Sequence, residues 1–190
     1  MALARPAGTW KYADLLDLPD DGTRYEIIDG ELYELPAPLF AHVAAVIALL
    51  DLLLPLVQRL GGKRYTAPVD VVFPGVDPVE PDIVVLLPGS LARPVRRGIE
   101  GPPDLLIEVL SPSNRSHDTV RKRDIYARGG VREYWIVDPE AASVEIIGSD
   151  GETVQRVTAA AGDTILTLRS PLLGEFTADA AEMFPGYEED

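Results

Sequence analysis

The sequence predicts a mixed α/β domain in which helices flank one β-sheet. Three short apolar runs typical of strands lie between residues 64 and 110, with a long helical segment before them and a shorter one after them. Two hairpin signals, Asp29-Gly30 and Ser149-Asp150-Gly151, add antiparallel strands on either side of this region. The chain has 190 residues, 46% of them hydrophobic, which suffices for a single domain over residues 1–190.

The first third of the chain is predicted to hold a short helix, a hairpin and a long helix, at residues 10–18, 25–35 and 40–60. Thr9 can cap the short helix, and Gly61-Gly62 closes the long one. Because the long helix is apolar nearly all round, we expect it to be buried centrally or shared with a second subunit in a homodimer. Asp51 and Pro55 interrupt its apolar run, which is too short to span a bilayer, so we expect no membrane partner. The first residues carry no apolar leader, and we expect a cytoplasmic protein of bacterial type.

Strands dominate the rest of the chain, with one further helix among them. Aliphatic and β-branched runs predict the strands, and Pro74-Gly75 and Pro102-Pro103 mark loops between them. The second helix opens at Ser116 or Asp118 and ends at Gly129-Gly130. The predicted elements are three strands, the helix, a strand, a hairpin, a short strand and a final helical turn: residues 64–73, 82–87, 104–110, 116–129, 133–137, 143–157, 164–168 and 178–184.

Composition and charge narrow the possible functions. The chain has no cysteine, which excludes disulfides, thiolate metal sites and a cysteine nucleophile. Its net charge of −14 argues against a general nucleic-acid binder. Residues 93–132 nevertheless hold nine basic and five acidic side chains, a balance of +4 that leaves −18 on the other 150 residues. These basic residues either serve a phosphate-handling site or lie scattered over a solvated helix face.

Asp82 and Glu108 are the most informative pair of residues. Each acid lies in a short apolar run, where a carboxylate is costly to bury unless something pairs with it. We expect the two to converge at one edge of the sheet and to hold a divalent cation, Mg²⁺ or Mn²⁺, with the backbone carbonyl of Val109 in reach of the same ion. The alternative is that each acid begins or ends a strand and points into water.

The helix after Glu108 supplies a third element of this site. Asp118, Lys122 and Tyr126 are four residues apart and form one stripe. Lys122 is one of three lysines against fourteen arginines, and its compact ammonium suits a group that positions or deprotonates an attacking water. The alternative is a simple helix pair between Asp118 and Lys122.

Five further residues are singled out by type and position. Glu26 lies on the first hairpin and either reaches the site or is a surface acid, while Asp70 would line the same pocket. His42 and His117 are the only histidines, and two histidines without a third ligand make no zinc site, so each is interpreted as a capping or surface residue. Trp135 is interpreted as a core residue.

Five segments form a specific combination, which includes both acids and the helix stripe: residues 24–32, 81–83, 107–113, 118–126 and 130–139. Together they resemble the Uma-two family, and the resemblance covers about residues 9–185. It implies the PD-(D/E)xK restriction-endonuclease-like fold, a mixed sheet flanked by helices. The two hairpin signals add an N-terminal hairpin and a C-terminal antiparallel extension to that fold. It also implies that Asp82 and Glu108 match the family's metal-binding acids. Leu110 stands where the general nuclease motif has its lysine, and Lys122 matches the lysine that this family carries on the following helix.

These observations predict a Mg²⁺-dependent endonuclease that hydrolyses DNA phosphodiester bonds. The expected catalytic residues are Asp82, Glu108, Lys122 and, as a further candidate, Glu26; the expected substrate-binding residues are Arg115, Arg121, Arg123 and Tyr126. Two alternatives remain open: a non-catalytic dimeric interaction module with a degenerate nuclease site, and a metal-dependent hydrolase of small phosphoesters.

Overall fold

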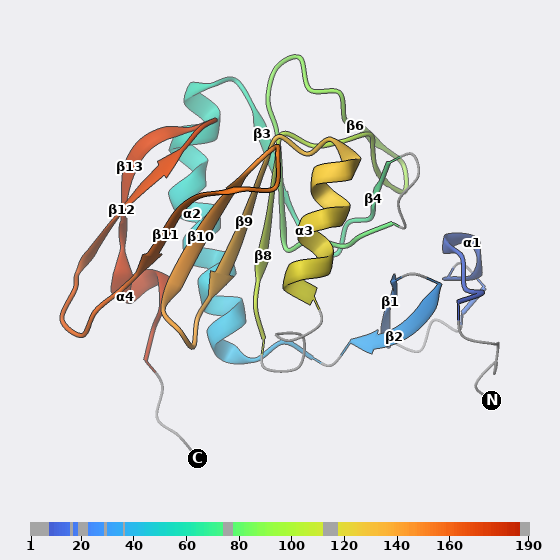
Figure 1. Ribbon diagram of the computed structural model, residues 1–190, viewed down its shortest axis with the longest axis horizontal. Coiled ribbons are helices and arrows are strands. Elements are labelled where there is room, and N and C mark those ends of the chain that lie inside the picture. Colours follow the sequence, from blue (N-terminus) through green and yellow to red (C-terminus); the bar gives the residue numbers. More distant parts are fainter. Residues whose placement is uncertain are drawn as a thin grey trace.

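A six-stranded mixed sheet forms the centre of the protein, in the spatial order β11-β10-β9-β8-β5-β3 (Figure 1). The computed structural model describes residues 8–15, 17–18, 23–28, 30–35, 37–73, 78–111 and 118–186. The strands of this sheet are β3 (Lys63–Thr66), β5 (Ile83–Leu86), β8 (Leu105–Val109), β9 (Glu133–Asp138), β10 (Ser143–Gly148) and β11 (Thr153–Thr158). Within this sheet β8 and β9 run parallel and the other neighbours run antiparallel, which confirms the predicted mixed α/β architecture.

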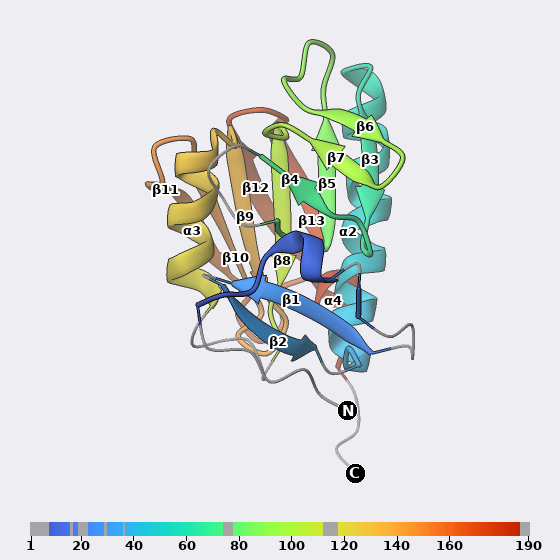
Figure 2. The same ribbon diagram turned by 90° about the vertical axis from the view of Figure 1, so that its right-hand side faces the viewer.

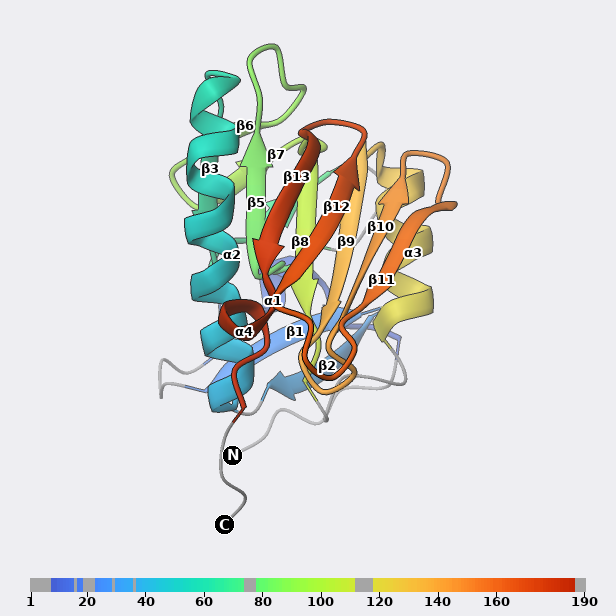
Figure 3. The ribbon, with the colours of Figure 1, turned by 90° about the vertical axis from the view of Figure 1, so that its left-hand side faces the viewer.

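Different elements cover the two faces of the sheet. One face carries helix α2, a β-hairpin and a short helix (Figure 3): α2 (Phe40–Arg59), β12 (Ile165–Ser170), β13 (Gly174–Asp179) and α4 (Ala180–Met183). The opposite face carries helix α3 and a small three-stranded sheet (Figure 2): α3 (Asp118–Gly129), β4 (Val71–Val72), β6 (Arg93–Val95) and β7 (Gly98–Glu100). The N-terminal part of the chain adds a short helix and a hairpin: α1 (Tyr12–Leu15), β1 (Arg24–Ile28) and β2 (Glu31–Leu35).

Strand alternation divides the apolar side chains between two cores. In β8, Leu105 and Ile107 belong to the core under α2, whereas Leu106 belongs to the core under α3. Glu108 has the same parity as Leu106 and therefore faces α3. The alternation of one strand thus brings this acid beneath the helix that carries the predicted lysine.

The long helix α2 buries one stripe and exposes another. Its buried side chains are four residues apart and belong to the core on that face: Ala45, Leu49, Leu53 and Val57. On its outer side Phe40 and Ile47 are 66% and 56% exposed, and Val43 is exposed as well. Of the two expectations for this helix, central burial is therefore wrong.

The length of α2 also differs from the sequence prediction. The helix continues through Pro55, and its 20 residues, which include an 18-residue window with a mean hydropathy of 2.3, are long and apolar enough to cross a membrane by length and composition alone. The prediction of a run too short to span a bilayer was wrong. Only 22% of its most apolar window is buried within the chain, and core helices of soluble proteins meet the same criterion.

Several element boundaries also differ from prediction. The predicted strand 64–73 is divided into β3 and β4, which belong to different sheets, because Pro68 has no N–H to continue a ladder. The β6–β7 hairpin was not predicted, since Pro94 argues against a strand; β6 tolerates it as an edge strand. Strand β13 was not predicted either, and the short first helix begins at Tyr12 rather than Trp10.

A buried glutamate joins β9 to the β12–β13 turn. Glu133 is fully buried and accepts hydrogen bonds from Trp135 Nε1 at 2.6 Å and from the Leu172 backbone N–H at 2.9 Å. Burial raises the pKa of Glu133, and the hydrogen bonds from Ser170, Trp135 and Leu172 offset only part of that effect. Trp135 is a core residue, as predicted.

Candidate active site

The two strand acids lie where β5 begins and β8 ends. The antiparallel register pairs Ile83 with Ile107, and extending it by one residue sets Asp82 opposite Glu108. Directly opposed residues in antiparallel strands have Cβ atoms roughly 5 Å apart. The strand pairing therefore brings the backbones of the two acids to adjoining strand ends.

Glu108 is buried and bonded to two side chains of α3. Its Oε1 accepts a hydrogen bond from the Tyr126 hydroxyl at 2.5 Å, and its Oε2 lies 3.2 Å from Lys122 Nζ. The three residues are 5%, 1% and 4% exposed, respectively for Glu108, Tyr126 and Lys122. One charged and one neutral donor offset the cost of burying the carboxylate. The predicted helix stripe thus delivers both of these side chains to the acid.

Asp82 is bonded to the strand end and to a histidine from α2. Its Oδ2 accepts the backbone N–H of Val109 at 2.8 Å, and its Oδ1 lies 3.1 Å from His42 Nε2. The other ring nitrogen of His42, Nδ1, lies 3.1 Å from the Val109 carbonyl oxygen. The interpretation of His42 as a capping or surface residue was therefore wrong. A separation of 67 residues from Val109 left no local pattern that would have indicated the contact.

Leu110 shows why the lysine does not come from β8. Its side chain is buried in the same core cluster as Leu106 and Tyr126, where an ammonium would lack solvent. The ammonium beside Glu108 comes instead from Lys122, one helix later in the chain. This geometry agrees with what the family resemblance implies, namely that the lysine lies at position 122 on α3 and not at position 110.

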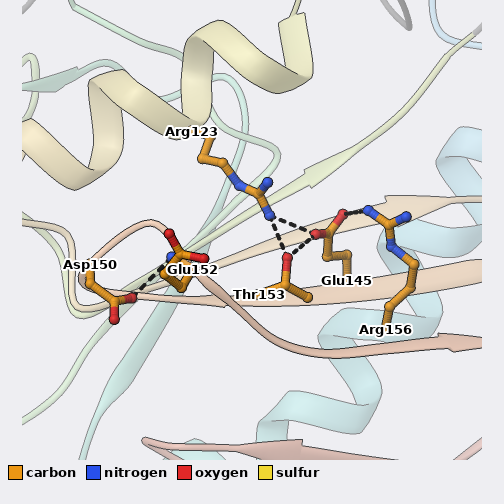
Figure 4. Close-up of polar contacts among 6 residues, drawn as sticks. All are labelled: Arg123, Glu145, Asp150, Glu152, Thr153 and Arg156. Atoms are coloured by element: carbon orange, nitrogen blue, oxygen red, sulfur yellow. Dashed lines mark hydrogen bonds and ion pairs between the residues drawn. The ribbon is translucent and has the colours of Figure 1, made fainter.

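Arg123 belongs to a different cluster, drawn in Figure 4. Its Nη2 lies 2.6 Å from Glu145 Oε1 and 2.8 Å from Thr153 Oγ1, while Arg156 bonds the other oxygen of Glu145 at 2.5 Å. Burial alone would raise the pKa of Glu145, but the Thr153 hydroxyl and the two guanidinium groups outweigh it and lower this pKa. Arg123 therefore helps to hold α3 against β10 and β11.

Five sequence candidates have side chains outside the part of the chain that the structure describes: Glu26, Arg115, His117, Asp118 and Arg121. The backbone of Glu26 lies in β1, and Asp118 and Arg121 lie in α3. Their roles remain predictions.

Asp70 lines a cavity that neither of the two acids reaches. The cavity has a volume of about 480 Å³, and its lining includes Asp70, Arg96 and Arg97 but neither Asp82 nor Glu108. The prediction that Asp70 shares the pocket of the acids was wrong. The division of the predicted strand 64–73 into β3 and β4 accounts for this, because Asp70 lies between them, and its carbonyl accepts the Ile99 N–H of β7.

The donor chemistry of the site fits a divalent cation held by few protein ligands. Within the described ranges, no group of three or more histidine or acidic side chains is arranged to hold a metal ion. Two of the expected oxygen ligands, Asp82 Oδ1 and the Val109 carbonyl, nevertheless approach a single imidazole ring. Mg²⁺ binds through one or two carboxylates and keeps several waters, so it does not require a full protein cage.

A mixed sheet with helices on both faces and two acids at adjoining strand ends defines the class of restriction-endonuclease-like proteins. The chain belongs to the Uma-two family: the model of this family, Uma2, "Putative restriction endonuclease", matches residues 12–181. A crystal structure of "a putative nuclease belonging to DUF820" from Anabaena variabilis ATCC 29413 is similar, with a TM-score of 0.72 and 20% sequence identity; the match covers 90% of this chain and 96% of the other. No curated protein matches the chain.

Proposed function

We propose that the protein is a Mg²⁺- or Mn²⁺-dependent endonuclease that hydrolyses DNA phosphodiester bonds. The observation that carries this proposal is the pairing of buried Glu108 with Lys122, across from Asp82 at the same end of the sheet. A buried lysine–carboxylate pair beside a second acid is costly to maintain as structure alone, since apolar side chains of similar volume are often equally stable. The presence of this buried pair beside Asp82 therefore favours a catalytic role.

The residues would divide the work by their positions. Asp82 would hold the cation, with Glu108 as the second acid, while the Val109 carbonyl, also an expected ligand, faces His42 Nδ1. When bound, a divalent cation polarises the scissile phosphate and lowers the pKa of a coordinated water. Lys122 would orient the attacking water or stabilise the charge that develops on the phosphate. Tyr126 donates a hydrogen bond to the Glu108 carboxylate, which also binds the Lys122 ammonium, and so holds that carboxylate in place.

DNA is the substrate class that the charge distribution favours. Residues 93–132 carry +4 against −14 for the whole chain, and this segment includes Glu108, Lys122 and the exposed Arg96 and Arg97 of the β6–β7 hairpin. A local excess of arginine and lysine contacts phosphates and makes binding sensitive to salt. The acidic remainder would keep the chain from binding nucleic acid elsewhere.

A plasmid assay tests the proposal. Supercoiled DNA is incubated with the protein and Mg²⁺ or Mn²⁺, and nicked and linear forms are measured over time. Asp82→Asn and Glu108→Gln should abolish cleavage, whereas Asp51→Asn, at an exposed acid of α2, should not change it. Absence of cleavage by the wild-type protein, or equal cleavage by the two site variants, would remove the endonuclease proposal.

The exposed face of α2 favours a second candidate, a dimeric interaction module. Phe40, Val43 and Ile47 are spaced as one stripe of the helix and are exposed in the single chain. A second copy covering this stripe would make a homodimer, with or without nuclease activity. Sedimentation velocity at micromolar concentration should show a dimer that Ile47→Glu converts to a monomer; a monomeric wild type contradicts the dimer.

A further inference from the structure

His42 brings a ring nitrogen to the centre of the candidate site. Its imidazole lies between Asp82 Oδ1 and the Val109 carbonyl oxygen, each 3.1 Å from a different ring nitrogen. The three residues come from α2, from the segment before β5 and from the end of β8.

The two contacts determine which nitrogen carries the hydrogen in the neutral ring. The Val109 carbonyl can only accept, so Nδ1 must donate to it. In a neutral imidazole Nε2 then presents its lone pair to Asp82 Oδ1, only 3.1 Å away. Two electron-rich atoms at this distance repel unless a positive charge lies with them. A proton on Nε2, which makes the ring an imidazolium, or a metal ion bound by both atoms can supply that charge.

We propose that His42 Nε2 is a ligand of the catalytic cation, beside Asp82 Oδ1; this inference rests on the metal-dependent function proposed above. Two donors about 2.1 Å from one octahedral ion, at a right angle, lie about 3.0 Å apart. The observed distance of 3.1 Å between His42 Nε2 and Asp82 Oδ1 matches that spacing without any rearrangement of the two side chains. The Val109 carbonyl, by accepting from Nδ1, has the role that backbone carbonyls commonly take behind metal-bound histidines: it fixes the tautomer and the ring orientation.

A nitrogen ligand changes which ion the site prefers. Mg²⁺ is bound in proteins by oxygen ligands, whereas imidazole suits first-row transition ions. The site should therefore bind Mn²⁺ more tightly than Mg²⁺, by a margin that depends on His42. The side chains of His42 and Asp82 are 14% and 16% exposed, which leaves the ion a route from solvent.

Pulsed electron paramagnetic resonance of the Mn²⁺-loaded protein tests the contact directly. The wild-type spectrum should show coupling from a directly bound imidazole ¹⁴N, and labelling histidine with ¹⁵N should change that coupling. His42→Asn should abolish it. His117→Asn, at the other histidine of the chain, is the matched control and should retain it.

Calorimetry with each ion alone supplies the second measurement. His42→Asn should weaken Mn²⁺ binding by about tenfold or more, and Mg²⁺ binding by clearly less, while Asp82→Asn should weaken both. Thermal unfolding in EDTA establishes that each variant is folded. The electron paramagnetic resonance spectrum of the wild-type protein tests the inference without any substitution.

The outcomes separate this inference from the proposed function. If the wild-type protein binds Mn²⁺ without nitrogen coupling, or with coupling that His42→Asn retains, His42 is not a ligand and the metal-dependent proposal stands. A Mn²⁺ to Mg²⁺ affinity ratio unchanged by His42→Asn also overturns the inference. If the wild-type protein binds neither ion, both proposals fail, and the contact is an imidazolium–carboxylate pair.

Discussion

Replacing Lys122 by methionine removes the ammonium that pairs with Glu108 inside the protein. Methionine matches the four-atom apolar stem of lysine and lacks only the terminal ammonium, so the change isolates the charge. Both residues are nearly inaccessible, at 4% and 5% exposed, and the ammonium–carboxylate distance is 3.2 Å. The variant leaves Glu108 as a buried carboxylate that retains the bond from Tyr126. Removing one partner of a buried ion pair typically costs about 3–5 kcal/mol. We therefore expect Lys122→Met to lower the free energy of unfolding by about 3 kcal/mol.

Urea unfolding followed by far-UV circular dichroism measures this loss. At about 2 kcal/mol per molar urea, a loss of about 3 kcal/mol lowers the midpoint by about 1.5 M. The solution should contain EDTA, because a bound cation would partly replace the missing charge. Lys63→Met, at an exposed lysine of β3, is the matched control and should leave the midpoint unchanged.

A double-mutant cycle decides whether the pair is the cause. Glu108→Gln combined with Lys122→Met removes both charges, so the double variant should be less destabilised than the sum of the single variants, by about 1–3 kcal/mol. Additive losses, or a midpoint shift of Lys122→Met below about 0.5 M, would refute the argument that these two buried charges depend on each other.

Three further predictions concern single residues. Tyr126→Phe removes the hydrogen bond to the Glu108 carboxylate and should lower the free energy of unfolding by about 1.5–3 kcal/mol in thermal denaturation. Leu110→Lys, which restores the lysine of the general motif, should destabilise the protein by more than about 2 kcal/mol because the site is a packed core; a stable and more active variant would contradict this. Burial raises the pKa of Glu133 above its ordinary value of 4.5, so the folded state retains a proton that the unfolded state has lost. The free energy of unfolding of the wild-type protein, compared with that of Glu133→Gln at the same pH, should therefore fall as pH rises from about 4.5 to the raised pKa. Urea titrations at several pH values measure it, and an equal pH dependence of the two proteins would show the reasoning wrong.

The predicted parts of the site follow from local periodicity. An acid inside an apolar run and a lysine and tyrosine four residues apart on a helix are visible in the sequence, and the structure joins Glu108 to Lys122 and Tyr126. Alternation along β8 also determines that Glu108 and Leu106 share a face. The partner of Asp82 was not predictable in this way, because His42 comes from another helix and no periodic pattern links the two positions.

The sequence by itself determined the class of fold, the β1–β2 and β10–β11 hairpins, the long helix and the two acids, because these depend on residues near one another in the chain. Only the tertiary structure decided that β5 and β8 set Asp82 opposite Glu108, that Asp70 lines a separate cavity, and that His42 lies against Asp82. These contacts depend on strand register and on how helices pack across the sheet. Register and packing are set by the whole core at once, so no short segment of the chain contains them.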